Sequence, residues 1–86
     1  MSHTNAEAAA LNSDQRAIVK ALTGSTAWCN WEAIPGETTY LRDDITTLMQ
    51  RCILDSTRRL GTTYVRLSHY GRAVETELRK IEAEGA

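Results

Sequence analysis

The stretch from residue 62 to residue 81 most constrains what this chain can fold into. Over Thr62–Leu67, Val65 and Leu67 alternate with other residues at the period of a half-buried β-strand. Ser68 follows at once and can cap a helix, because its hydroxyl oxygen can accept a hydrogen bond from a free N–H of the first turn. The apolar positions after it recur at helical spacing: Tyr70, Val74, Leu78 and Ile81. The stretch therefore predicts a strand that runs directly into a closing helix.

The best-patterned helix of the chain is predicted over residues 39–53, with Thr38 or Thr39 as its cap. Its apolar stripe consists of Leu41, Ile45, Leu48, Met49, Cys52 and Ile53. Its sides and back carry Arg42, Asp43, Thr46, Thr47 and Gln50. Between this helix and the strand, Ser56–Gly61 is expected to form a turn that exposes Arg58 and Arg59.

A shorter helix is predicted near the N-terminus. Asn12 or Ser13 can cap it, an apolar face follows at Ile18, Ala21 and Leu22, and Gly24 permits the left-handed exit. Residues 1–10 are small and polar and are expected to be a disordered tail. A single domain is therefore predicted over residues 11–82, with residues 83–86 frayed.

The segment Thr26–Ile34 leaves two alternatives open. Trp28, Trp31 and Ile34 recur every three residues, which fits a short helix. Alternatively, residues 27–29 form a brief strand and Asn30 caps a single helical turn. Either element ends at Pro35-Gly36. As the largest apolar groups of a small core, at least one of the two tryptophans is expected to be buried.

The charge of the chain is unevenly placed. The formal net charge is −1, yet Thr39–Arg72 carries six arginines against three aspartates, a net +3, while the remainder carries −4. Arginine suits bidentate contacts with phosphate or carboxylate. The asymmetry therefore indicates a basic face on an acidic body.

Several classes of protein are disfavoured by what the sequence contains. No apolar run approaches the length of a membrane span, no nucleophile elbow or phosphate-binding glycine loop is present, and Cys29, Cys52, His3 and His69 lack metal-ligand spacing. We therefore expect no enzyme, no cofactor, no metal and no membrane partner. The two cysteines are expected to be partly buried thiols without a disulfide, and the location to be cytoplasmic.

The order of these elements from about Asp14 to Arg79 resembles winged helix-turn-helix regulators of the MarR and PadR type. The closest local similarity is Tyr64, Arg66-Leu67-Ser68 and Gly71-Arg72, which look like the Y-x-R-L-[ST]-x-x-G-R run that closes the wing in that family. The resemblance implies a mainly α fold with a small β-ribbon, in which Ser68 caps the last helix and Gly71 lets that helix approach its neighbour.

The resemblance also implies duplex DNA as the partner and transcriptional regulation as the role. Thr39–Ile53 would be the recognition helix in the major groove and Ser56–Thr63 the wing near phosphates. The candidate base contacts are then Arg42, Thr46, Thr47 and Gln50, and the candidate phosphate contacts are Arg51, Arg58, Arg59 and Arg66. A homodimer, joined through the terminal helix or the Trp28/Trp31 region, would supply two half-sites.

Two aspartates favour a different partner. Asp43 lies nearly opposite the apolar stripe of the predicted recognition helix, where a carboxylate would face the phosphate-lined groove. Asp43 and Asp44 also complement the positive end of that helix. The alternative function is therefore a winged helix that binds another protein and has no affinity for nucleic acid.

Overall fold

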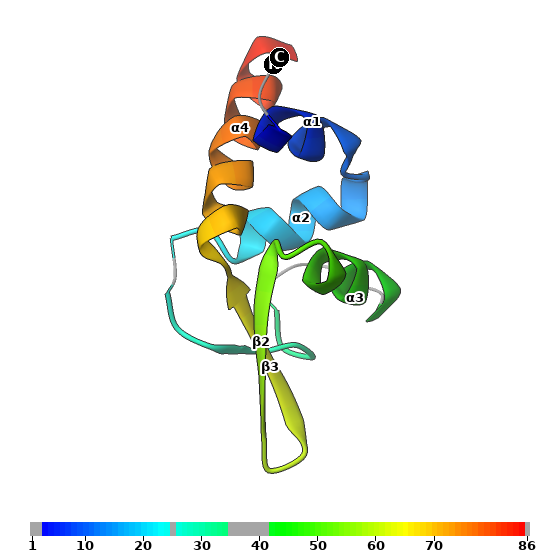
Figure 1. Cartoon of the computed structure of the whole chain (residues 1–86), viewed down its shortest axis with the longest axis vertical. Coiled ribbons are helices and arrows are strands. Elements are labelled where there is room, and N and C mark those ends of the chain that lie inside the picture. The colour runs from blue at the N-terminus through cyan, green and yellow to red at the C-terminus, as the bar shows by residue number, and fades with distance from the viewer. Residues whose placement is uncertain (1–2, 25, 35–41, 86) are drawn as a thin grey trace.

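The chain folds as a small mixed α/β protein, whose computed structural model describes residues 3–24, 26–34 and 42–85 (Figure 1). Within these residues, four helices and one three-stranded antiparallel sheet occur in the order α1 (His3–Ala10), α2 (Ser13–Ala21), β1 (Cys29–Asn30), α3 (Arg42–Gln50), β2 (Leu54–Arg59), β3 (Thr62–Leu67) and α4 (His69–Gly85). The molecule measures 42 × 25 × 22 Å, and the long axis reflects the β2–β3 hairpin that projects from the helices.

The hairpin is longer than the sequence predicted. Residues 56–61 were expected to form a turn, but β2 extends to Arg59 and pairs with β3 from Leu54↔Leu67 to Arg59↔Thr62. Only Leu60 and Gly61 form the turn, and both have positive φ. The ladder of hydrogen bonds with β3 holds this polar segment extended, so tertiary pairing overrides its turn-like composition.

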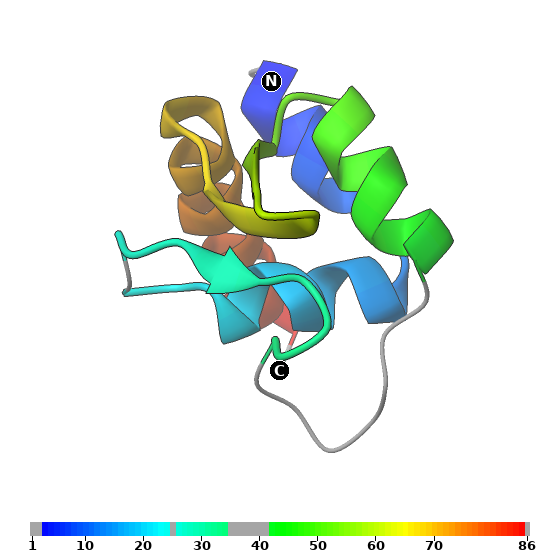
Figure 2. The ribbon, with the colours of Figure 1, turned by 90° about the horizontal axis from the view of Figure 1, so that it is seen from below.

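The sheet has the order β1-β3-β2, so β3 is its central strand. Cys29 pairs with Val65 and Asn30 with Tyr64, and the Asn30 side chain then accepts from the N–H of Glu32 at 2.9 Å. The strand alternative for this segment is therefore the closer one, although β1 begins two residues later and ends one residue later than predicted and is followed by a turn. Seen along the hairpin, α3 lies on one side of it and the β1 segment on the other (Figure 2).

The core lies where α2, α3 and α4 meet the base of the hairpin. Its largest completely buried side chains come from these elements and from Ile53 between α3 and β2: Ile18, Val19, Ile45, Leu48, Ile53, Val65, Val74 and Leu78. Each was predicted, on the helical or strand period of its segment, to point inward, except Val19. Ile34 is also buried, whereas Trp28 and Trp31 are both only half-buried, contrary to the expectation that one would be enclosed.

Helix α3 ends earlier than predicted, at Gln50 instead of Ile53; the predicted cap and the positions 39–41 lie outside the described residues. Cys52 adopts φ 63°, its N–H donates to the Met49 carbonyl, and the Ile53 N–H donates to the Leu48 carbonyl at 3.0 Å. These bonds form a Schellman motif, in which the left-handed residue turns the chain out of the helix. Cys52 is consequently exposed, and the prediction that it is partly buried was wrong.

One hydroxyl joins the end of α3 to the start of α4. Ser68 Oγ accepts from the Gly71 N–H at 2.8 Å, which confirms the predicted cap, and donates toward the carbonyls of Cys52 and Ile53 at 2.5 and 3.0 Å. A Cβ on Gly71 would lie 2.0 Å from the Ile53 oxygen. Glycine is therefore required here by the close approach of the two segments, as expected. We call this group of Cys52, Ile53, Ser68 and Gly71 the Ser68 joint.

Residues 3–10 of the expected tail are helical and not disordered. Helix α1 covers most of the expected tail, packs against α4 and buries Ala8 completely. Alanine has the highest helix propensity, and its small side chain lets two helices approach closely, so a weakly amphipathic segment can still form a packed helix. Helix α4 likewise continues to Gly85 instead of fraying after residue 82. Between α1 and α2, Asn12 caps α2 in a capping box with Gln15.

Candidate nucleic-acid interface

The outward side of α3 presents the residues that the sequence predicts as base contacts. Arg42, Thr46 and Gln50 are exposed, while Ile45 and Leu48 on the opposite side are buried. Thr47 is half-buried, and its hydroxyl donates a hydrogen bond to the Asp43 carbonyl at 2.8 Å. The hydroxyl proton is therefore already used in a hydrogen bond within the helix. Three of the four predicted base contacts are thus open to solvent on one helix.

Arg42 is held by two groups that the sequence did not connect with it. Its guanidinium is 2.8 Å from a carboxylate oxygen of Glu32 and 5.1 Å from the centre of the Trp31 ring. Glu32 and Trp31 follow β1, so this contact joins the start of α3 to the sheet. Both charged side chains of the pair are more than 60% exposed, at 69% and 63%, so the pair is screened by water and is easily exchanged for another partner. Nothing in the spacing of these residues signals the contact.

The two arginines of the hairpin point to opposite faces. Side chains alternate along a strand, so Arg58 lies on the face that holds Leu54 and Val65 against the core, and Arg59 lies on the reverse face. We call these the inner and outer faces of the hairpin. Arg58 and Arg59, which the sequence predicts to be exposed in one turn, therefore lie in β2 and on opposite faces of the hairpin.

The outer face carries a cation stacked on an aromatic ring. The guanidinium of Arg66 is 4.2 Å from the centre of the Trp28 ring, and its Nε is 4.0 Å from a carboxylate oxygen of Asp55 on the paired strand. Tyr64 lies on the same face by register. Asp55 therefore offsets part of the positive charge of Arg66, which is one of the predicted phosphate contacts.

Arg51 does not join the arginines of the hairpin. It lies just beyond α3, 3.9 Å from the carboxylate of Glu7 in α1. Helix α1 is at the end of the molecule opposite the hairpin tip (Figure 1). The structure therefore separates Arg51 from the other predicted phosphate contacts.

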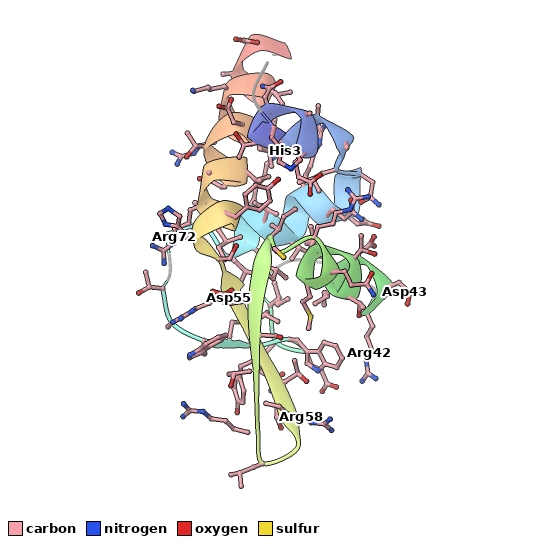
Figure 3. The ribbon with its side chains drawn as sticks, viewed as in Figure 1. His3, Arg42, Asp43, Asp55, Arg58 and Arg72 are labelled. Carbon is pink, nitrogen blue, oxygen red and sulfur yellow. The ribbon has the colours of Figure 1, made fainter. Side chains whose placement is uncertain are left out.

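Arg42 and Arg58 come together around one hollow. This open hollow has a volume of about 350 Å³ and is lined by Asn30, Trp31, Glu32, Arg42, Arg58, Gly61, Thr62 and Thr63. Figure 3 shows both arginines in the half of the molecule that holds the hairpin, whereas Arg72 lies on the other side, at the start of α4. The start of α3 and the inner face of the hairpin thus form one concave, arginine-bearing surface.

The remaining reactive side chains are dispersed. Within residues 3–24, 26–34 and 42–85, no three histidine, cysteine, aspartate or glutamate side chains gather as a metal site. Cys29 and Cys52 are free thiols, and burial raises the pKa of Cys29 above its ordinary value. None of the described helices combines the length and apolar character needed to cross a bilayer.

Comparison of the chain with protein-family models, curated proteins and solved structures finds no match. Function is therefore inferred from the charge and geometry of α3 and the hairpin alone.

Proposed function

We propose that this protein is a winged-helix protein that binds double-stranded DNA and regulates transcription. The observation that carries the proposal is the hollow lined by both Arg42 of α3 and Arg58 of the hairpin. A winged helix binds DNA with one helix in the major groove and a β-hairpin against the neighbouring backbone, so cations on both elements must face the same duplex. The element order and the sheet order β1-β3-β2 are compatible with this layout.

Helix α3 is the proposed major-groove element. Its exposed side offers Thr46 and Gln50, and glutamine can bind the N6 and N7 atoms of adenine in a bidentate manner. At the start of the helix, a phosphate or a guanine edge can replace Glu32 as the partner of the exposed Arg42 guanidinium. Asp43 is exposed beside it and would favour a cytosine amine over any acceptor at that position.

The hairpin is the proposed wing, with its two terminal arginines on different parts of the backbone. No carboxylate among the described residues pairs with Arg58 or Arg59, so both guanidinium groups can bind phosphate without first breaking an ion pair there. Arg58 on the inner face would contact the strand next to α3, and Arg59 on the outer face a phosphate farther along the duplex.

The experiment that tests this function is a titration of the protein with random duplex DNA over a range of salt concentrations. Binding should be measurable at low salt, and the double variant Arg58→Ala/Arg59→Ala should reduce the slope of log K against log salt by about 2, near one unit for each arginine removed from a phosphate. Arg72→Ala/Lys80→Ala removes the same charge from α4 and should leave the slope almost unchanged. Equal slopes for all three proteins would reject the wing assignment.

A second candidate function, binding to another protein, is supported by the ion pair between Arg42 and Glu32. Glu32 and Asp43 place two exposed carboxylates around Arg42, and the sequence pI is about 6.1. A surface of mixed charge over a half-buried tryptophan suits a protein partner better than a polyanion. Absence of any duplex binding at low ionic strength would favour this protein-contact role.

A further inference from the structure

The tip of the hairpin carries a large apolar side chain in open solvent. Leu60 is 105% exposed, and it is the only large hydrophobic residue of the described chain that is exposed in this way. Every other leucine in the described residues is buried. The hydrophobic effect opposes this placement in the isolated protein, because burial of a leucine side chain is favourable.

The backbone at the tip is also unfavourable for leucine. Leu60 has φ 50° and Gly61 has φ 79°, the values of a two-residue turn in which both central residues are left-handed. Such turns favour Asn-Gly or Asp-Gly, since a residue with a larger side chain is strained at positive φ. Gly61 fits its position, whereas asparagine in place of Leu60 would suit the turn better and expose less apolar surface.

The charges next to Leu60 indicate what could cover it. Arg58 and Arg59 precede it directly and lie on opposite faces of the hairpin, so the apolar tip is flanked by a cation on either side. A protein pocket or a lipid surface would cover leucine equally well, but a cation on each side of a narrow blade matches a groove with phosphates along both walls. The minor groove of duplex DNA is such a groove, about 6 Å wide.

We propose that Leu60 enters the minor groove as an apolar wedge, opens one base step and bends the duplex, with Arg58 and Arg59 on the phosphates of the two walls. The proposal rests on the DNA-binding function proposed above. Paired strands are about 4.8 Å apart before side chains are added, so the two-residue tip enters while the ribbon remains outside. Apolar wedges of this kind kink DNA by roughly 20–90° toward the major groove, and flexible pyrimidine–purine steps open most easily.

The test measures bending and stability together. A duplex of about 30 base pairs with a central TA step and a fluorophore at each end reports the end-to-end distance by energy transfer. Wild-type protein should bring the ends closer. Leu60→Asn should abolish the bend and raise the melting temperature of the free protein, while Leu60→Met, which stays apolar, should keep the bend. Affinity should fall by no more than about tenfold in Leu60→Asn, because the lost burial and the avoided unstacking offset each other.

The outcomes separate this inference from the function on which it rests. No duplex binding by wild type at low salt would reject both. Binding without a bend, or a bend that persists in Leu60→Asn, would overturn the wedge and leave DNA binding intact. Sedimentation without DNA provides the remaining check: self-association by wild type that Leu60→Asn abolishes would assign the leucine to a contact between two copies of the chain, and would overturn the wedge.

Discussion

The helical end of the molecule and the tip of the hairpin differ in how their cationic and leucine side chains are placed. On the helices, Lys20 pairs with Glu82, Arg79 with Glu75 and Lys80 with Glu77, and leucines lie inside. On the hairpin, Arg58 and Arg59 have no acid partner among the described residues, and Leu60 lies in solvent. Three cations of the helical end thus have an acid partner in the same chain and its leucines are buried, whereas the tip of the hairpin has two cations without an acid partner among the described residues and one exposed leucine. Under the proposed function, the first part stabilises the fold and the second part binds DNA.

Glycine substitutions should give the largest difference in stability between the helical end and the hairpin. Gly71→Ala places a Cβ 2.0 Å from the Ile53 carbonyl oxygen, a backbone atom that cannot move without opening the Ser68 joint. We expect a loss of about 4 kcal/mol or more in the free energy of unfolding, at the upper end for single substitutions. Gly61→Ala meets no atom within 4 Å and suffers only the strain of φ 79°, about 1–2 kcal/mol. Urea unfolding of both variants measures the difference, and equal losses would break the comparison.

Leucine truncations should differ nearly as much. Leu48→Ala removes a completely buried side chain between α3 and the core and should cost about 3 kcal/mol. Leu60→Ala removes one that contacts only water and should change stability by less than about 0.5 kcal/mol. Thermal unfolding at a fixed protein concentration compares the two. A clear destabilisation by Leu60→Ala would show that the tip packs against something in the free protein.

Substitution of Tyr70 should change the free energy of unfolding by less than the leucine truncation in the core, and in the opposite direction. Its hydroxyl is buried without a hydrogen-bond partner among the described residues, so Tyr70→Phe should stabilise the protein by about 1 kcal/mol. Burial, with smaller effects from Glu7 and Cys52, raises the pKa of Tyr70 above 10.0, so the folded phenol stays neutral where the unfolded one ionises. Wild-type stability should therefore be intact below pH 10 and fall as the pH rises from there through the folded pKa.

The loss of stability with rising pH should be smaller in Tyr70→Phe than in the wild type. Denaturant unfolding between pH 8 and pH 11 compares the two proteins. A Tyr70→Phe variant less stable than wild type at pH 8 would mean that the hydroxyl has a partner after all.

The ion pairs of the helical end should contribute least. Lys20 and Glu82 are 54% and 32% exposed, and such a pair contributes about 1 kcal/mol or less and is screened by salt. A double-mutant cycle with Lys20→Met and Glu82→Gln should give a coupling near this value at low salt and almost none at 1 M salt. A coupling that persists at high salt would mean that the pair is less hydrated than its exposure indicates.

The sequence predicted the fold best in segments where buried apolar residues recur at the period of a helix or a strand. The cap at Ser68 and most inward residues of α3, β3 and α4 are local patterns that were confirmed, whereas Cys52 of the predicted stripe is exposed. It failed where distant segments decide the outcome: α1 is a helix because α4 covers it, and β2 is a strand because β3 pairs with it. The Arg42–Glu32 contact and the division of Arg58 and Arg59 between two faces depend on tertiary placement and register, which no short motif encodes.

Because Leu54 pairs with Leu67, the first residue of β2 and the last residue of β3 lie side by side, directly beside the Ser68 joint. The part of the ribbon beyond Val65, which is itself buried in the core, is consequently an extension whose length can be changed without changing the body of the protein. Adding one residue to each strand would move the tip outward by about 3.3 Å but exchange the sides of every side chain beyond the insertion, whereas adding two to each would restore them. Evolution or engineering could thus adjust this arm only in even steps if the pattern at its end is to be preserved.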